Sequence, residues 1–440
     1  MSLRFGTDGV RGRALTELTL SFATDLGGAA ASVLGTGAWL IGRDTRESGP
    51  ALEAAFAAGL LQAGATAESV GVVPTPALAA LSQQLQRPAA MITASHNPWH
   101  DNGIKIFAAG GAKLSDDVEQ AIEAALEQRT AQPHDAAAAS TEVPSADLVH
   151  RYRDHLLAQF PAGALQGMRI VLDTANGAMS AIAGDVATAL GAEVTVINHT
   201  PDGRNINAQC GATHPHPLAE AVVAQGAHLG LAFDGDGDRV IAVDELGDVV
   251  DGDRMIALAA LQLKAQGALA NDTVVVTVMS NLGFHRAMRD AGIAVVSTAV
   301  GDRFVLEALG AGGFSVGGEQ SGHIIYADVA TTGDGLLAGL RLAHHVREQG
   351  RTLHELASTV MHSYPQVLTN VTVAERHPHV ADELAADIAA ATAALGGDGR
   401  VLVRASGTEP LIRVMVEAAT PELAERTAAA LAGVVRARFA

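Results

Sequence analysis

Short aliphatic segments that alternate with helical segments are the feature that most constrains the fold of this chain. Predicted strands such as 38–42, 89–93 and 169–173 have apolar centres, and Ala- and Leu-rich segments such as 49–64 lie between them. This alternation continues to about residue 350 and favours parallel α/β units. We therefore expect three similar mixed α/β domains, with mostly parallel sheets, in this part of the chain.

The end of the chain follows a different order, strand–helix–strand–strand–helix. Its predicted strands are 367–373, 400–404 and 411–417. This order indicates a small α+β domain rather than another βαβ unit. A Pro- and Ala-rich segment, 130–145, is predicted to be a linker or a loose loop. The fold class that we expect is α/β, with domains at 1–150, 151–250, 251–365 and 366–440, of which the last is the α+β domain.

The net charge excludes one class of partner. The chain has 29 Lys and Arg against 48 Asp and Glu, which gives a formal charge of −19. A general nucleic-acid surface needs clustered cations, so none is expected, and any anionic ligand must be held by a local basic pocket. Only three lysines are present, Lys105, Lys113 and Lys264, so each retained lysine is of slightly more interest than usual.

The remaining composition indicates a folded protein of the cytoplasm. The single cysteine, Cys210, excludes an intrachain disulfide and a thiolate zinc cluster. No signal-peptide core follows Met1, and no apolar stretch approaches the roughly 18 residues of a membrane helix. With 48% hydrophobic and 18% charged residues, the chain is not of the disordered class. We expect a cytoplasmic protein with no membrane partner.

Three aspartates at alternate positions follow a buried predicted strand directly. Asp234, Asp236 and Asp238 are separated by glycines and form an oxygen cage for a divalent cation, without which they would repel one another. A calcium-binding EF-hand is a rival, because Glu245 falls at its position 12. However, Arg239 stands where that loop needs Gly, and a strand rather than a helix enters it. Mg²⁺ is the better interpretation, since it is usually held by a few carboxylates plus a phosphate oxygen.

A serine stands at the end of another predicted strand, in the loop Thr93-Ala-Ser-His-Asn-Pro98. Ser95 is a candidate nucleophile, and a polar turn that caps the strand is the alternative. Adjacent residues of a strand point to opposite faces, so we do not expect His96 to act as a base for Ser95. No G-x-S-x-G elbow of a hydrolase surrounds the serine either.

Two further loops carry side chains suited to a sugar phosphate. Loop 317–323 combines hydroxyl, amide, carboxylate and imidazole groups, which suits a sugar, although an ordinary polar loop fits equally well. In segment 404–410 a Ser-Gly-Thr turn follows Arg404, and Arg413 comes soon after. Such amides, hydroxyls and guanidinium groups cradle a phosphate, and a surface turn with incidental arginines is the alternative. Together, the four loops are the equipment of phosphoryl transfer, whose catalysis is mainly positioning and charge stabilisation.

Six motifs in this order and spacing resemble the α-D-phosphohexomutase superfamily, most closely its bacterial phosphoglucosamine mutases. The resemblance covers the whole chain. The motifs are Phe5-Gly-Thr-Asp-Gly-Val-Arg-Gly12, Thr93-Ala-Ser-His-Asn-Pro98, Asp101-Asn-Gly-Ile-Lys105, Asp234-Gly-Asp-Gly-Asp-Arg239, Gly318-Glu-Gln-Ser-Gly-His323 and Arg404-Ala-Ser-Gly-Thr-Glu-Pro410.

The resemblance implies four domains around a central cleft and an intramolecular phosphotransferase. A phosphorylated Ser95 would exchange its phosphoryl group with a hexosamine phosphate through glucosamine 1,6-bisphosphate or a related hexose bisphosphate. The net reaction would convert glucosamine 6-phosphate to glucosamine 1-phosphate, which feeds UDP-N-acetylglucosamine and cell-wall synthesis. The four domains would carry the phosphoserine loop, the metal, the sugar-recognition loop and the phosphate-binding loop, in chain order.

The resemblance also assigns roles to individual residues. The catalytic group would be Ser95, Lys105, Arg11 and His323, with Lys105 or His323 in proton transfer. One Mg²⁺ would bind the Ser95 phosphate, Asp234, Asp236 and Asp238. The sugar would meet Glu319, Gln320 and Ser321, with Arg239, Asp302 and Arg303 lining the cleft. The non-reacting phosphate would meet Arg404, Ser406, Gly407, Thr408 and Arg413. One departure is Ala405, where the glucosamine branch more often has Lys.

Three alternatives stay open at this point. A phosphomannomutase/phosphoglucomutase is the nearest, although those enzymes tend to carry Met in place of Gln320, and segment 331–335 looks like the glucosamine branch. A metal-dependent sugar-phosphate phosphatase is a second, but it has no need for the second phosphate clamp around Arg404. A calcium-binding module is a third. The oligomeric state is open, with a homodimer among the alternatives.

Overall fold

The computed structural model describes residues 3–6, 8–130, 147–406 and 410–439. These residues form two compact units. The first combines residues up to 279 with residues 293–358, and the second combines residues 280–292 with residues from 359 onward. Each unit has its own sheets and its own hydrophobic core, so each is described by itself.

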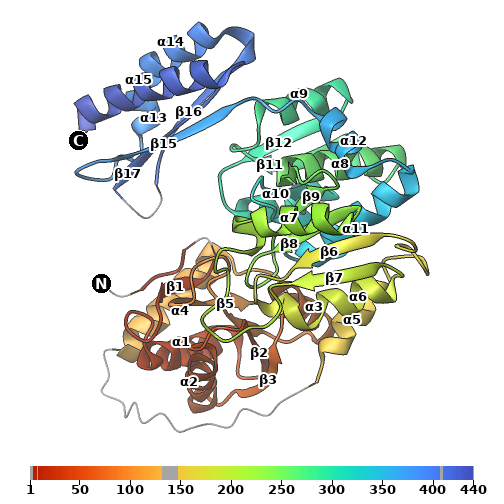
Figure 1. Ribbon diagram of the computed structural model, residues 1–440. Helices are drawn as coiled ribbons and strands as arrows, with labels where there is room; N and C mark the ends of the chain where they lie inside the picture. Colours follow the sequence, from red (N-terminus) through yellow and green to blue (C-terminus); the bar gives the residue numbers. More distant parts are fainter. Residues whose placement is uncertain (1–2, 7, 131–146, 407–409, 440) are drawn as a thin grey trace. The chain divides into compact units, whose positions relative to one another are not determined.

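The first unit contains three sheets that repeat one topology (Figure 1). In each repeat the first strand lies between the second and the third in parallel, and the fourth pairs antiparallel with the third. The four strands are β2 Ala38–Arg43, β3 Thr66–Val72, β4 Ala89–Ile92 and β5 Asp101–Phe107 in the first sheet. They are β6 Arg169–Asp173, β7 Glu193–Ile197, β8 Leu229–Phe233 and β9 Val240–Asp244 in the second. They are β11 Thr273–Thr277, β12 Ala294–Thr298, β13 Val316–Gly318 and β14 Ile324–Tyr326 in the third.

Two short strands extend the repeats at their edges. β1 Val10–Arg13 pairs antiparallel with β5, and β10 Val249–Val250 pairs antiparallel with β9. The prediction of three similar mixed α/β domains is therefore confirmed. The narrower expectation of mostly parallel sheets is wrong, because each sheet closes with an antiparallel fourth strand that the apolar patterning did not distinguish from a parallel one.

The helices of the first unit connect and cover these strands. Their bounds are α1 Leu20–Leu34, α2 Gly49–Gln62, α3 Thr75–Leu85, α4 Asp116–Thr130, α5 Val149–Leu157, α6 Ala183–Ala189, α7 His216–Gln225, α8 Gly252–Ala265, α10 Asp302–Gly312, α11 Gly335–Gln349 and α12 Leu353–Val360, the last of which ends in the second unit. Single-turn 3-10 helices η1, η2 and η3 lie at Ala178–Ala181, Gly211–Thr213 and Ala270–Asp272. Ile182 separates η1 from α6.

Small residues let the first two helices pack closely, which suits a chain with only 3% aromatics. A Cβ on Gly59 of α2 would lie 1.8 Å from the Thr24 carbonyl oxygen of α1, and one on Gly27 would lie 2.2 Å from that of Phe56. Only glycine allows this approach of the two backbones. The core beneath is aliphatic apart from a few rings, such as the edge-on pair Trp39 and Phe56.

The second unit is a small α+β structure, as predicted from the order of its elements. β15 Gln366–Thr372 and β16 Arg400–Ala405 flank β17 Leu411–Glu417 in an antiparallel sheet. Its helices are α9 Leu282–Asp290, α13 Val380–Glu383, α14 Ala385–Leu395 and α15 Pro421–Phe439, with η4 at Gly396–Asp398. Leu384, which lies outside helical geometry, separates α13 from α14.

Thr130, the first residue of the predicted linker 130–145, is the last residue of α4, and the rest of the linker lies outside the described residues. Within the described parts of the chain, no helix has both the length and the apolar character needed to cross a membrane.

Candidate active site

The three loops singled out in the first three domains occupy the same place in the three repeats. Ser95 lies between β4 and β5, Asp234–Asp238 between β8 and β9, and Glu319–His323 between β13 and β14. Each loop therefore joins the third strand of its sheet to the antiparallel fourth. The repeated topology explains why polar, Gly-rich segments recur after apolar strands in the sequence.

Ser95 is buried and its backbone is left-handed, with φ 52°. Its hydroxyl donates a hydrogen bond to Asp234 Oδ2 at 2.5 Å, which brings the first two loops together. Its Oγ also lies 3.3 Å from His96 Nδ1. The expectation that the two side chains point apart is wrong, because β4 ends at Ile92 and Ser95 is not in a strand.

The three aspartates form a compact carboxylate cluster. One oxygen from each of Asp234, Asp236 and Asp238 lies within 4.8 Å of the others, and all three side chains are buried. Asp236 Oδ1 and Asp238 Oδ1 have no hydrogen-bond partner among the described residues. Buried oxygens without partners are costly unless a cation or water satisfies them, so the cluster fits a divalent cation.

Burial raises the pKa of Asp234 well above its usual value, and the carboxylates of Asp238 and Asp236 add to the rise. Asp238 behaves in the opposite way. Burial alone would raise its pKa, but Lys105 and His323 outweigh that effect and hold the pKa well below its usual value. The cluster therefore contains one carboxylate that resists ionisation and one that is held ionised by cations nearby.

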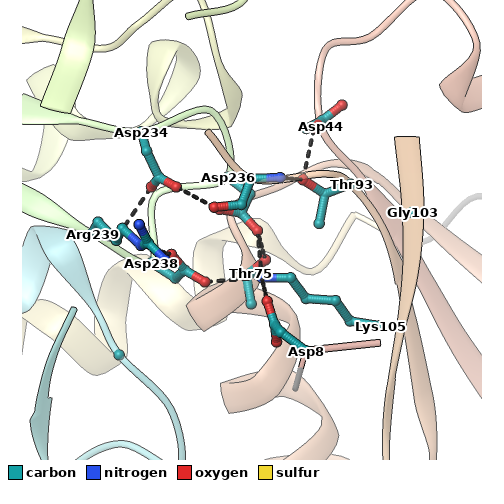
Figure 2. A network of polar contacts seen from close by, with 12 residues as sticks. Asp8, Asp44, Thr75, Thr93, Gly103, Lys105, Asp234, Asp236, Asp238 and Arg239 are labelled. Carbon is teal, nitrogen blue, oxygen red and sulfur yellow. Dashed lines mark hydrogen bonds and ion pairs between the residues drawn. The ribbon is translucent and has the colours of Figure 1, made fainter. Parts of the chain in front are cut away.

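Lys105 is the cation at the centre of this arrangement (Figure 2). Its Nζ lies 2.8 Å from Asp236 Oδ2, 2.9 Å from Asp238 Oδ2 and 2.8 Å from Asp8 Oδ2. Burial would lower the pKa of Lys105, but the three carboxylates raise it well above its usual value. Thr75 adds a hydrogen bond from its hydroxyl to Asp236 Oδ2 at 2.7 Å. Lys105, on β5, thus joins the sheet that carries the Ser95 loop to the loop Asp234–Asp238.

Charges of alternating sign continue from Lys105 into a closed ring. Asp8 Oδ1 lies 2.6 Å from Lys113 Nζ, and Lys113 also contacts Asp302 Oδ2. Asp302 lies 3.5 Å from His323 Nε2, and His323 Nδ1 lies 3.7 Å from Asp238 Oδ1. Arg11 joins from outside, 2.8 Å from Asp8 Oδ2. All four predicted catalytic residues therefore lie in or beside one network.

His323 is buried, and the backbone amide of Gly333 donates a hydrogen bond to its Nε2 at 3.1 Å. A Cβ on Gly333 would lie 2.5 Å from the imidazole, so only glycine at this position leaves enough room for the His323 ring. Burial would lower the pKa of His323, but Asp238 and Asp302 raise it above its usual value.

The predicted sugar-binding residues divide into two sets. Glu319 is close to the network: its Oε1 accepts from the amide of Gly301 at 3.0 Å, and its Oε2 accepts from the hydroxyl of Ser321 at 3.4 Å. Arg239 directly follows the loop Asp234–Asp238, and its backbone amide donates a hydrogen bond to Asp234 Oδ1 at 3.2 Å. The pKa of Arg239 is raised by Asp238 and Asp234 in spite of its burial.

The other set makes contacts elsewhere. Gln320 donates to Asp251 Oδ2, the N-cap of α8, at 3.3 Å. Arg303 pairs with Glu119 at 2.9 Å and Glu307 at 3.1 Å, and with Asp116. The structure therefore brings Asp302 into the network and holds its neighbour Arg303 among the carboxylates of α4 and α10.

The predicted phosphate clamp lies in the second unit and is described by itself. Arg404 on β16 is the direct cross-strand partner of Arg413 on β17. Among the described residues, Arg413 Nε has no hydrogen-bond partner although it is buried. Like charges directly opposite destabilise a sheet, so this pair fits an anion between or beside the guanidinium groups. Ser406 is buried, with its amide 2.7 Å from the Leu411 carbonyl, and Gly407 and Thr408 lie outside the described residues.

Sequence reasoning did not assign Asp8, Thr75 or Lys113 to the site. Asp8 stands inside a quoted motif, next to the predicted Arg11. Lys113 had a weaker signal, because it is one of only three lysines. Thr75 starts α3, and nothing in its local sequence pointed to Asp236.

Four segments of the chain match the successive domains of the phosphoglucomutase/phosphomannomutase family. The matches are to alpha/beta/alpha domain I over residues 2–133, domain II over 150–247, domain III over 251–364 and the C-terminal domain over 368–434.

Two curated relatives are similar over almost their whole length. The phosphoglucosamine mutase of Frankia alni is 51% identical over 455 residues, covering 99% of both chains. That of Saccharopolyspora erythraea is 52% identical over 446 residues, covering 99% of this chain and 100% of the relative.

Solved structures show the same fold at low identity. A phosphoglucomutase/phosphomannomutase family protein from Burkholderia thailandensis superimposes with a TM-score of 0.81 at 23% identity, covering 98% of this chain and 97% of that one. The N-acetylphosphoglucosamine mutase of Aspergillus fumigatus, in complex with GlcNAc-6P and magnesium, gives a TM-score of 0.71 at 20% identity, covering 99% and 96%.

Proposed function

The chain belongs to the phosphoglucosamine mutase family of the α-D-phosphohexomutases, which are intramolecular phosphotransferases, and from this premise we propose that it interconverts glucosamine 6-phosphate and glucosamine 1-phosphate. The single observation that carries the proposal is the hydrogen bond between Ser95 Oγ and Asp234. The bond joins the proposed phosphoryl carrier to the proposed cation-binding cluster, and phosphoryl transfer needs both.

The proposed reaction uses Ser95 as a temporary carrier. Phosphoserine transfers its phosphoryl group to the C1 hydroxyl of glucosamine 6-phosphate, the P–O bond to Ser95 breaks, and the hydroxyl proton passes to the serine oxygen. Glucosamine 1,6-bisphosphate is then turned over in the site. Its 6-phosphoryl group returns to Ser95, the serine proton passes to the sugar O6, and glucosamine 1-phosphate leaves. Atoms and charges balance over the cycle, and Ser95 ends phosphorylated.

Cations around the serine neutralise the transferring group in this proposal. Lys105 and Arg11 face the phosphoryl oxygens, and His323 or Lys105 moves the proton. The carboxylates of Asp234, Asp236 and Asp238, with the Ser95 phosphate, would hold Mg²⁺, which would withdraw charge from the phosphoryl oxygens. The two unsatisfied carboxylate oxygens support this assignment.

The remaining predicted residues bind the sugar phosphate in this proposal. The sugar hydroxyls meet Glu319, Gln320 and Ser321, with Arg239, Asp302 and Arg303 around them. The non-reacting phosphate meets Arg404, Ser406, Gly407, Thr408 and Arg413. The opposed arginines of β16 and β17 support a phosphate-binding role for this sheet.

The broader organisation is part of the same proposal. We place domain boundaries at 1–150, 151–250, 251–365 and 366–440, with the phosphoserine, metal, sugar and phosphate loops in that order. The family matches at 2–133, 150–247, 251–364 and 368–434 support these bounds. We also propose a cytoplasmic location and a homodimer, and sedimentation of the purified chain tests the latter.

Intact mass and product analysis test the mechanism together. Purified protein is incubated with glucosamine 6-phosphate and a catalytic amount of hexose bisphosphate, and we expect phosphate on Ser95 and formation of glucosamine 1-phosphate. Ser95→Ala removes both, while Ser32→Ala on α1 serves as the matched control. Near-normal turnover in Ser95→Ala refutes the mechanism. Steady release of inorganic phosphate without an isomer indicates a phosphatase, and faster turnover of mannose or glucose phosphates indicates a phosphomannomutase/phosphoglucomutase.

A further inference from the structure

A buried arginine lies under the phosphoserine loop and contacts none of the metal ligands' side chains. Arg46 follows β2, and its side chain is fully buried, as is that of Asp44, whose Oδ2 lies 2.9 Å from Arg46 Nε. The segment was not assigned a role from its sequence. An arginine with no exposed surface is rare unless its donors are all satisfied, so its partners show what it does.

All the donors of Arg46 are used, and four of them go to one loop. One terminal nitrogen donates to the carbonyls of Ser95 at 2.9 Å and Asn97 at 2.8 Å. The other donates to the carbonyl of Asp101 at 2.9 Å and to that of Pro98. Nε donates to Asp44, which completes the five N–H groups of a guanidinium.

The same ion pair also reaches the amide of Ser95. The Thr93 hydroxyl donates to Asp44 Oδ2 at 2.7 Å, and the Thr93 oxygen accepts from the Ser95 amide at 2.9 Å. Both the N–H and the carbonyl of Ser95 are therefore held through Arg46 and Asp44. Asn207 holds the carbonyl from the second sheet's side, with its Nδ2 2.9 Å away.

Ser95 needs such support because of its backbone. A left-handed conformation is unfavourable for a residue other than glycine, and it persists only where the surroundings impose it. In this conformation the carbonyls of the loop converge on one point, and the Ser95 hydroxyl meets Asp234. A lysine ammonium has three donors on a flexible stem and does not reproduce the five donors of a planar guanidinium.

The far end of the loop is held by the next residue of the same segment. Glu47 receives two hydrogen bonds from Arg204, at 2.7 Å and 3.0 Å. The Arg204 guanidinium lies over the ring of Trp99, 5.2 Å from its centroid. Residues 44–47 thus hold the loop from Thr93 to Asp101 along its whole length.

We propose that Arg46 is a positioning residue for phosphoryl transfer, which keeps Ser95 in the one backbone conformation that presents its oxygen to the metal loop. The inference rests on the proposed role of Ser95 as phosphoryl carrier. Because the five donors of Arg46 go to Asp44 and to the carbonyls of the Ser95 loop, its loss acts on the rate of transfer and not on substrate affinity.

Arg46→Lys is the direct test, with Arg43→Lys as the matched control. Arg43 is the last residue of β2, three residues before Arg46, and pairs with Glu53 at 2.7 Å; among the described residues, no side-chain hydrogen bond joins it to the Ser95 loop. Misplacement of a reacting group by about 1 Å costs about 100-fold in rate, so we expect kcat to fall by about that factor in Arg46→Lys with KM little changed. In Arg43→Lys both constants stay near those of the wild type.

A second readout separates this inference from the proposed function. Transfer of phosphate from a hexose 1,6-bisphosphate to Ser95 is followed by intact mass, without any need for turnover of glucosamine 6-phosphate. We expect slow phosphorylation in Arg46→Lys and a normal rate in the control. If the wild type becomes phosphorylated on Ser95 but does not isomerise the amino sugar, the substrate assignment fails. The phosphorylation rates of Arg46→Lys and of the control still test the role of Arg46.

Thr93→Val keeps the test decisive if Arg46→Lys does not fold. It has nearly the same shape and removes only the hydroxyl between Asp44 and the Ser95 amide, so phosphorylation of Ser95 slows less than with loss of the arginine. A folded Arg46→Lys protein with wild-type kcat and phosphorylation rate overturns the proposal, as does a fall in substrate affinity alone. Normal rates in Thr93→Val overturn it where the arginine variant is lost.

Discussion

The surroundings of Ser95 and the sheet of the second unit handle charge in opposite ways. Around Ser95, Lys105 contacts three carboxylates, and cations and anions alternate in a ring. On the other sheet, Arg400 is paired with Glu417, but Arg404, four residues along the same strand, faces Arg413. One region alternates charges of opposite sign, and the other sets two like charges opposite each other on neighbouring strands.

In the proposed function, this difference separates residues that position a reacting group from residues that bind a phosphate of the substrate. A group that reacts must be held before the substrate arrives, so the protein supplies both signs of charge and many hydrogen bonds. A side chain that only binds a phosphate can keep a positive charge that the bound phosphate itself neutralises, and this attraction strengthens binding. Arg400 shows that the same sheet can pair an arginine when its purpose is structural.

The largest expected effect comes from removing charge in the region around Ser95. Asp236→Asn and Asp238→Asn each remove a proposed cation ligand, and we expect turnover to fall by about 10²–10³-fold, with weaker metal binding in calorimetry. Asp185→Asn, on α6, is the control, since Asp185 pairs with Arg153 and belongs to no such cluster among the described residues. Turnover and metal affinity equal to the wild type in the first two variants would contradict the cation site.

A loss of stability should follow from breaking the pair in the second unit. Arg400→Met leaves the buried Glu417 without its cation, and we expect the free energy of unfolding to fall by roughly 3 kcal/mol in urea titrations. Arg413→Met removes one of two opposed like charges, and among the described residues Arg413 Nε has no hydrogen-bond partner, so stability stays level or rises slightly. Equal losses in the two variants would remove the distinction between structural and binding arginines on this sheet.

Substrate affinity should depend on the opposed arginines. Arg413→Met removes a charged donor from the proposed clamp, worth about 1.5–3 kcal/mol, so KM for the sugar phosphate rises by about 10–100-fold. We expect kcat to change much less. Inorganic phosphate should raise the melting temperature of the wild type more than that of Arg413→Met. A variant with lower kcat and unchanged KM would place Arg413 in the reaction instead.

The smallest effect concerns a buried carboxylate without a cation in hydrogen-bond contact. Burial raises the pKa of Asp334, the N-cap of α11, to about 6, although the hydroxyl of Tyr152 donates to it. At pH values between these two pKa values, about 6 in the folded state and near 3.9 in the unfolded state, the carboxyl of Asp334 is protonated in the folded state and ionised in the unfolded state. Stability is greater below pH 4–5 for this group and is lost as the pH rises through 6.

Unfolding at two pH values measures this contribution. Between pH 5 and pH 7 the wild type loses roughly 1 kcal/mol on account of Asp334, and Asp334→Asn lacks that loss. The comparison of the two proteins cancels other titrating groups. A pH dependence that is the same in both would show that Asp334 titrates at its usual value.

The sequence predicted the domain order, most strands and the loops of the site, because apolar strands followed by polar, Gly-rich turns are local signals. It did not predict that the three loops are the same loop of a repeated topology, since pairing order within a sheet is not local. His96 was misplaced for a related reason: strand alternation was extended past Ile92, where the strand ends. Arg46 carried no signal, because its partners are carbonyls that any sequence supplies.

Stacking of Arg204 on Trp99 gives the protein an optical marker. The chain has only two tryptophans, and Trp39 is fully buried while Trp99 is 37% exposed. Quenchers in solution therefore reach the indole of Trp99 and not that of Trp39. Because Trp99 lies four residues after Ser95, in the loop held by Arg46, its emission reports on this loop without any added label, and we expect it to change when Ser95 is phosphorylated as proposed.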